Sequence, residues 1–162
     1  MVKLIDEFML KKLKHESNLS TRRRQHLNLH ASHDEPCQRL LNFINFDSYI
    51  RPHKHNETSG NELLICIKGA LSLLIFDVNG SLLKRYKISS DNSKYFGNYG
   101  VEILPDTWHT VISETEYCVI LEVKSGPYIA QSGKQFAPWA PEESSSDALR
   151  YFMKLRNLKP FA

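Results

Sequence analysis

The stretch from Tyr49 to Lys124 is divided into short apolar runs, and residues that favour turns separate each run from the next. The runs cover residues 62–67, 70–76, 82–88, 99–104, 108–113 and 117–123. Turn signals such as Asp77–Gly80 and the Pro105-Asp106 pair lie between them. Short runs that follow one another without helical patterns favour a sandwich or barrel over alternating strands and helices. We therefore predict an all-β core.

The segments that flank this core predict short helices and loops. Residues 4–19 place apolar side chains between lysines at helical spacing, which predicts an amphipathic helix, and an extended polar loop follows. Residues 37–46 fit a second short helix. Near the C-terminus we expect a Pro-rich loop and a closing helix, whose apolar positions are Leu149, Phe152, Met153 and Leu155.

We expect a single domain in three parts. Residues 1–47 form an N-terminal helix and basic arm, residues 48–125 form the β-barrel, and residues 126–162 form the Pro-rich loop and the C-terminal helix. The length of 162 residues, with 41% apolar and 24% charged residues, suits one core. Trp108 is expected in that core, and Trp139 is expected to plug one end of the barrel.

The charge and the apolar pattern exclude several classes of protein. The net charge is +3, and the basic excess lies in residues 1–30. Arg22–Arg24 have no flanking aromatic residues, so we expect no nucleic-acid partner. No apolar run approaches the ~20 residues of a membrane span, and the first residues lack the apolar stretch of a signal peptide. We expect a cytoplasmic protein with free thiols at Cys37, Cys66 and Cys118.

Three histidines and a glutamate carry the strongest chemical signal. His53 and His55 are two residues apart, so on a strand both rings point to one face. Glu62 opens a strand-like run, and His109 follows a turn near the start of another. Three imidazole nitrogens and a carboxylate suit a divalent Fe, Mn, Ni, Co or Zn ion. Glu57 is the alternative carboxylate, and we prefer Glu62.

This pattern resembles the cupin superfamily. His53, His55, Glu62 and Gly69 match its first motif, with six residues between the glutamate and the glycine and a longer insertion between His55 and Glu62. Gly100, Pro105 and His109 correspond to its second motif, but an expected glycine is absent and the proline-to-histidine distance is shorter by one. The strings RRRQHLNLH, QRLLNFINFDSYIRPHKH, TWHTVI and APWAP are similar to WbuC-type cupins, which are encoded with bacterial O-antigen and other surface-polysaccharide genes. The resemblance implies a double-stranded β-helix, or jelly roll, with a metal site in the barrel mouth.

Other residues are candidates for the site. Alternation places Tyr49 and Arg51 on the face of the histidines, so Tyr49 is a candidate acid or base and Arg51 a candidate anion clamp, or else a solvated strand-end residue. Arg22 and Arg24 alternate with His26, Asn28 and His30 in an arm that crosses the barrel mouth, or in a solvated basic loop. Tyr128 is a further candidate for substrate binding.

Two classes of function remain open at this point. The first is a metal-dependent enzyme that acts on a sugar, sugar nucleotide or similar polar metabolite, with isomerase or epimerase chemistry preferred and an iron dioxygenase as the alternative. The second is a non-catalytic, ligand-binding or regulatory cupin. In either case we expect a small-molecule ligand, for example an anionic sugar derivative, and a homodimer.

Overall fold

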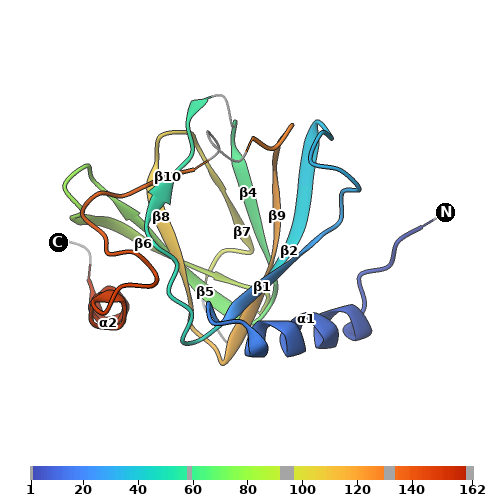
Figure 1. Ribbon diagram of the computed structural model, residues 1–162, viewed down its shortest axis with the longest axis horizontal. Coiled ribbons are helices and arrows are strands. Elements are labelled where there is room, and N and C mark those ends of the chain that lie inside the picture. Colours follow the sequence, from blue (N-terminus) through green and yellow to red (C-terminus); the bar gives the residue numbers. More distant parts are fainter. Residues whose placement is uncertain (1, 58–59, 92–96, 130–133, 160–162) are drawn as a thin grey trace.

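The computed structural model describes residues 2–57, 60–91, 97–129 and 134–159. Two five-stranded antiparallel sheets form its body (Figure 1). The first has the strand order β1-β2-β9-β4-β7, and the second has the order β10-β3-β8-β5-β6. The strands are β1 (Arg24–Asn28), β2 (Cys37–Asn45), β3 (His53–Lys54), β4 (Glu62–Lys68), β5 (Ala70–Phe76), β6 (Leu82–Ser89), β7 (Gly100–Ile103), β8 (Trp108–Ser113), β9 (Tyr117–Ser125) and β10 (Gln135–Phe136). The predicted all-β jelly roll is confirmed.

The space between the sheets holds an apolar core. Leu64 and Ile120 from the first sheet pack in one cluster with Leu73 and Val111 from the second, and all four are buried. On each strand the inward side chains alternate with outward ones, as the period of two requires. Polar residues replace apolar ones toward one end of the first sheet's inner face, and this end carries the site.

Strand β2 corrects the helix that the sequence predicted for residues 37–46. It pairs with β9 along its whole length and with β1 at its other edge. Leu41 and Phe43 are buried in a cluster on the outer face, whereas Gln38 and Asn42 line a cavity on the inner face. Because both faces carry apolar residues, the alternation is hidden and the spacing imitates a helix.

The predicted N-terminal helix is confirmed as α1 (Glu7–Leu19). The side chain of Asp6 accepts a hydrogen bond from the Met9 N–H at 2.9 Å, so the helix begins at Glu7. Leu10 and Leu13 pack against the outer face of the first sheet, beneath β1 and β2 in Figure 1. The polar segment after α1 is in part a strand, β1, and not only a loop.

The C-terminal helix is confirmed as α2 (Ala148–Asn157). Phe152 and Leu155 are buried as predicted, but Leu149 and Met153 are exposed, because the face of α2 toward the barrel is completed by Ala148. The same apolar cluster contains Trp108. Trp139 packs against it, with its ring centroid 5.1 Å from that of Phe76, so this end of the barrel is filled.

Gly69 joins β4 to β5 in a backbone conformation that other residues rarely adopt. Its φ is +79°, in the left-handed region. A Cβ atom here would lie 2.5 Å from the carbonyl oxygen of Tyr117. The glycine of the first cupin motif is therefore required by the turn between the two sheets.

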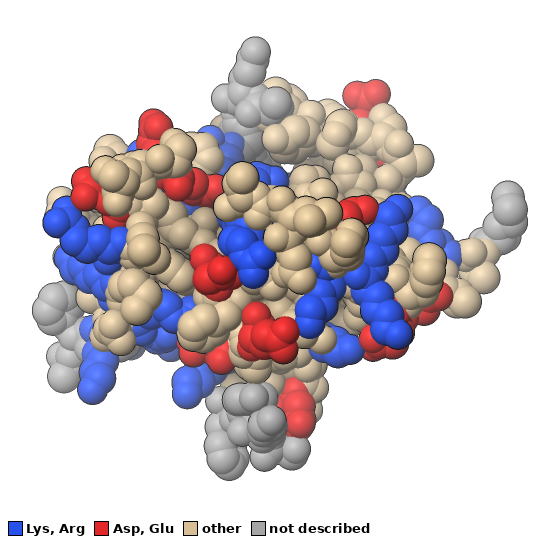
Figure 2. Space-filling view, turned by 60° about the horizontal axis from the view of Figure 1, so that its bottom comes forward, with Lys and Arg blue, Asp and Glu red and all other residues tan. Residues whose placement is uncertain are grey.

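Charged residues of both signs share the face that carries α1. Figure 2 shows Lys and Arg side chains interspersed with Asp and Glu over this face. Lys14 lies 3.0 Å from Glu116, and Arg23 lies 2.9 Å from Asp47. The basic excess of residues 1–30 is thus partly paired. In the part of the chain that the structure describes, neither helix combines the length and the apolar content needed to cross a membrane.

Candidate metal centre

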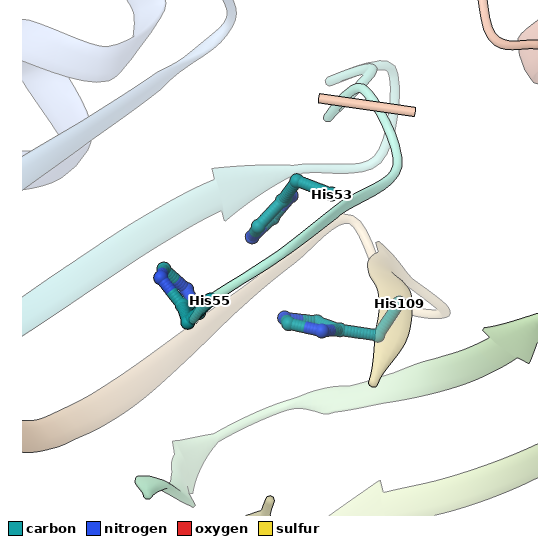
Figure 3. Close-up of side chains that lie close together, drawn as sticks. All are labelled: His53, His55 and His109. Carbon is teal, nitrogen blue, oxygen red and sulfur yellow. The ribbon is translucent and has the colours of Figure 1, made fainter. Parts of the chain in front are cut away.

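Three histidines from the second sheet meet at one point. His53 opens β3 and lies opposite His109 on β8, and His55 follows two residues after His53. One nitrogen atom from each ring lies within 4.8 Å of the other two. All three side chains are buried. Figure 3 shows the rings turned toward a common space between them.

Backbone carbonyl groups orient two of these rings. Nδ1 of His53 lies 2.9 Å from the carbonyl oxygen of Arg51, and Nδ1 of His109 lies 2.8 Å from that of Thr107. A carbonyl oxygen only accepts, so each Nδ1 carries the proton and donates. The lone pair of each Nε2 is then available to a metal ion. Burial, together with Lys134 and His109, lowers the pKa of His53 well below its ordinary value, which keeps this ring neutral.

Glu62 brings a carboxylate from the first sheet to the histidines. Its Oε2 lies 3.3 Å from Nε2 of His109, and its Oε1 lies 3.6 Å from Nε2 of His55. Burial opposes ionisation, but the contacts with His109 and His55 outweigh it and hold the pKa of Glu62 well below its usual range. Glu57 is exposed. The carboxylate beside the histidines is therefore that of Glu62.

These four side chains fit a divalent transition metal. Neutral imidazole nitrogens and one carboxylate oxygen are donors that Fe, Mn, Ni, Co and Zn all accept. The orientation of the rings leaves donor atoms directed at a shared point, which is the arrangement a metal ion needs. Among the described residues, the three histidines form the one group of three or more His, Cys, Asp or Glu side chains close enough to share an ion.

The metal centre opens into a cavity of about 1360 Å³ along the inner face of the first sheet. Strand register sets the floor of this cavity. Glu62 on β4 lies opposite Lys124 on β9, which lies opposite Gln38 on β2. Two further rows run across β4, β9, β2 and β1 in the same register, namely Leu64-Glu122-Leu40-Asn28 and Cys66-Ile120-Asn42-His26. The cavity therefore extends from the metal centre to β1.

Glu122 is the second carboxyl group on this floor. Asn42 donates to its Oε2 at 2.5 Å, and Lys124 donates to its Oε1 at 2.6 Å. Burial, followed by the negative charge of the neighbouring Glu62, raises the pKa of Glu122. The sequence reading missed both Glu122 and Asn42. Each of them alternates with apolar neighbours, which is the signal that could have revealed it. Glu122 lies in a run that we predict to be core, and Asn42 lies in the segment that we predict to be a helix.

Arg51 and Arg24 both line the cavity, but acidic residues already contact them. Arg24 forms two hydrogen bonds with Glu143, at 2.6 and 2.7 Å. Arg51 donates to the carbonyl oxygen of Ala137 at 3.0 Å and lies 3.9 Å from Glu142. Neither guanidinium is a solvated strand-end group. Each instead ties the segment after β10 to the edge of the cavity.

Arg22 and Tyr128 also line the cavity, at its rim. Tyr128 is 45% exposed, and its ring centroid lies 5.2 Å from that of His33. Arg22 is exposed, and no ion pair joins its side chain to the acidic residues that the structure describes. Both side chains are therefore accessible to a ligand.

Tyr49 lies in the apolar cluster beneath α2, at 9% exposure. Its hydroxyl donates to the carbonyl oxygen of Pro141 at 2.9 Å. Burial, together with Tyr151, raises the pKa of Tyr49. Tyr49 also lines the cavity, and its hydrogen bond to Pro141 holds the Pro-rich segment in place.

Several known proteins have similar structures, and one of them is a cupin barrel. A cupin 2 conserved barrel domain protein from Rhodopseudomonas palustris matches with a TM-score of 0.51 and 15% identity, over 81% of this chain and 73% of its own. Protein SO0799 from Shewanella oneidensis matches with a TM-score of 0.58 and 7% identity, over 84% and 87%. The capsular polysaccharide assembling protein CapF from Staphylococcus aureus matches with a TM-score of 0.55 and 16% identity, over 68% of this chain but only 29% of CapF.

The sequence itself matches one family model. The model is described as a domain of unknown function, DUF6016, and it matches residues 5–88. No curated protein sequence matches the chain. The matched residues include α1, the β1 and β2 strands and the His53-His55-Glu62 part of the metal centre. The chain therefore belongs to the DUF6016 family, and its fold is that of the cupin superfamily.

Proposed function

We propose that this protein is a metal-dependent cupin that acts on a sugar, sugar nucleotide or similar polar metabolite in bacterial surface-polysaccharide biosynthesis, with isomerase or epimerase chemistry. The observation that carries the proposal is the buried group of His53, His55, His109 and Glu62 at the end of a large cavity that both polar and apolar side chains line. The resemblance to WbuC-type cupins supports the pathway, and the name of CapF refers to capsular polysaccharide. Free thiols at all three cysteines support a cytoplasmic location.

The chain's own residues suggest how such chemistry proceeds. The three histidines and Glu62 would hold a divalent ion, which would supply Lewis-acid polarisation of a substrate oxygen. Glu122 lies on the cavity floor next to Glu62, and Asn42 and Lys124 fix its two oxygens. We assign it the transfer of a proton to or from the substrate. Tyr49, which also lines the cavity and whose hydroxyl is bonded to Pro141, is the alternative acid or base.

The first experiment tests the metal. Elemental analysis of the protein purified without added metal should find a divalent ion in the natural chain and little in His109→Ala. His15→Ala is the matched control, because His15 is exposed on α1. Equal metal content in all three proteins would overturn the proposed ligand set.

The second experiment tests turnover. Sugar nucleotides that raise the melting temperature are incubated with the protein, and products are followed by NMR. We expect Glu122→Gln to lose turnover by at least 10²-fold, in the usual range for an acid-base group, while Tyr49→Phe retains it. Stabilisation by sugar nucleotides without any turnover would favour the alternative, a non-catalytic ligand-binding or regulatory cupin.

We also propose a homodimer. Val2, Leu4 and Phe8 are exposed at the N-terminus, and Leu149 and Met153 are exposed on α2. Burial of such side chains against a second copy would remove apolar surface from water. Analytical ultracentrifugation should find a species of twice the chain mass, and a single species of 18.7 kDa would overturn the proposal.

A further inference from the structure

The end of the cavity farthest from the metal centre is formed by β1 and the loop that follows it. His26, His30 and His33 all line the cavity there, and we call these three residues the β1 subsite. The strand order places β2 and β9 between β1 and β4, which carries Glu62. At about 4.8 Å between neighbouring strands, β1 lies about 14 Å from β4. The two ends are thus separated by more than the length of one sugar ring.

His30 presents a buried ring nitrogen to this subsite. Its Nδ1 lies 3.0 Å from the backbone nitrogen of Arg39 and 2.9 Å from the carbonyl oxygen of the same residue. In the tautomer whose Nδ1 accepts from the Arg39 N–H, Nε2 carries the proton and is a donor. The side chain is 6% exposed, and its Nε2 has no hydrogen-bond partner among the described residues. A buried ring nitrogen without a hydrogen-bond partner is costly unless a ligand supplies one.

His33 joins this donor to the open rim. Its ring centroid lies 5.7 Å from that of His30 and 5.2 Å from that of Tyr128. The N–H of Tyr128 donates to the carbonyl oxygen of His33 at 2.7 Å, which fixes the loop against the segment after β9. The three rings form a wall whose outer members, His33 and Tyr128, are exposed.

The charges around His26 are positive. Burial is the largest cause of the lowered pKa of His26, and the other causes are Arg22, Lys124, His33 and His30, each of which opposes a further positive charge. By contrast, Glu143 lies against Arg24, which opens β1, and Glu142 lies against Arg51.

Two glutamates near the β1 subsite are already engaged. Glu122 is held by Lys124 and Asn42, so the charges of Glu122 and Lys124 offset each other. Glu35 accepts from the Ala31 N–H and pairs with Arg39. Among the groups that act on His26, Arg22 is the cation whose side chain is joined to no acidic residue that the structure describes, so its charge is available to a ligand.

We propose that the β1 subsite binds an oxyanion, a phosphate or carboxylate group, at the far end of the ligand whose other end reaches the metal centre. The imidazole N–H groups and the rim guanidinium of Arg22 are donors that form charge-assisted hydrogen bonds with such a group. The position of the far end rests on the proposed function, whereas binding of the anion itself does not. The separation of about 14 Å selects ligands of two parts, such as a sugar joined to a diphosphate, over a single sugar.

Isothermal titration with inorganic phosphate tests the subsite directly. The double variant His26→Gln/His33→Gln is suitable because both side chains are exposed, whereas His30 supports the backbone of Arg39. We expect it to bind phosphate about tenfold more weakly or worse, which corresponds to the loss of about one charged hydrogen bond. His15→Gln should bind phosphate normally. Thermal unfolding checks that each variant is folded.

His109→Ala separates the two sites. Its phosphate affinity should equal that of the natural chain even when it holds no metal. Unchanged phosphate binding in the double variant would overturn the proposal, and so would phosphate binding that depends on His109 alone. If the natural chain takes up no divalent ion but still binds phosphate at the β1 subsite, the proposed function is overturned and the subsite stands. A parallel titration with acetate compares a carboxylate with phosphate, and the anion that binds more tightly shows which of the two groups the β1 subsite prefers.

Discussion

Metal binding should raise the stability of the folded protein by an amount that can be calculated. His53 and His55 lie far from His109 in sequence, and the strand pair β3–β8 brings them together only on folding. The unfolded chain therefore lacks the complete site, and the ion stabilises the folded state alone. At a free metal concentration of about 100 times the dissociation constant, the gain is about 2.7 kcal/mol. For a domain of this size, that raises the melting temperature by about 5–11 °C.

Scanning calorimetry of the metal-free protein, with and without each divalent ion, measures this gain. His109→Ala should lose nearly all of the shift, because it removes a buried ligand whose ring is oriented by Thr107. His15→Ala should keep it. A shift of equal size in His109→Ala would mean that the ion binds elsewhere, and the reasoning from the histidine geometry would be wrong.

Three further predictions concern the fold around the site. The pKa of Glu62 is lower in the folded protein than in the unfolded chain, so Glu62 stabilises the fold above the unfolded pKa of about 4.3, and this stabilisation is lost as the pH falls below that value. In urea unfolding of the metal-free protein between pH 3 and 7, the free energy of unfolding of Glu62→Gln should therefore fall less steeply toward acid pH than that of the natural chain. An equal pH dependence in the two proteins would contradict this. Gly69→Ala should lower the free energy of unfolding by about 1–3 kcal/mol, because φ is +79° there, and a neutral effect in denaturant unfolding would refute the strain argument. Leu13→Ala should cost about 2–5 kcal/mol, whereas Leu19→Ala, at an exposed position, should cost about 0.5 kcal/mol or less; equal losses would show that α1 does not pack as described.

The sequence was sufficient for the strands of the core and for the shared face of His53 and His55. Both depend on the period of two, which is a local property of the chain. His53 and His55 therefore share a face whatever lies beyond them. His109 and Glu62 needed the additional knowledge that β8 and β4 come to the same end of the barrel, and the cupin resemblance supplied it.

Pairings between distant segments account for what the sequence did not reveal. Residues 37–45 imitate a helix until β9 is known to lie beside them. The partner of Arg24 is Glu143, far along the chain, so its commitment to an ion pair could not be read from local charge. The same applies to Glu122, whose neighbours on the cavity floor come from β2 and β4.

The candidate metal ligands come from both sheets, and this has a mechanical consequence. His53 and His109 belong to the second sheet, whereas Glu62 belongs to the first. An ion bound to all of them would act as a cross-link between the two layers at the end where polar residues replace the apolar core. Loss of the ion would then loosen the mouth of the barrel and would also remove the chemistry that the ion supplies. The spacing of the two sheets and the occupancy of the metal centre would then be coupled, and ligand access to the cavity would depend on the two together.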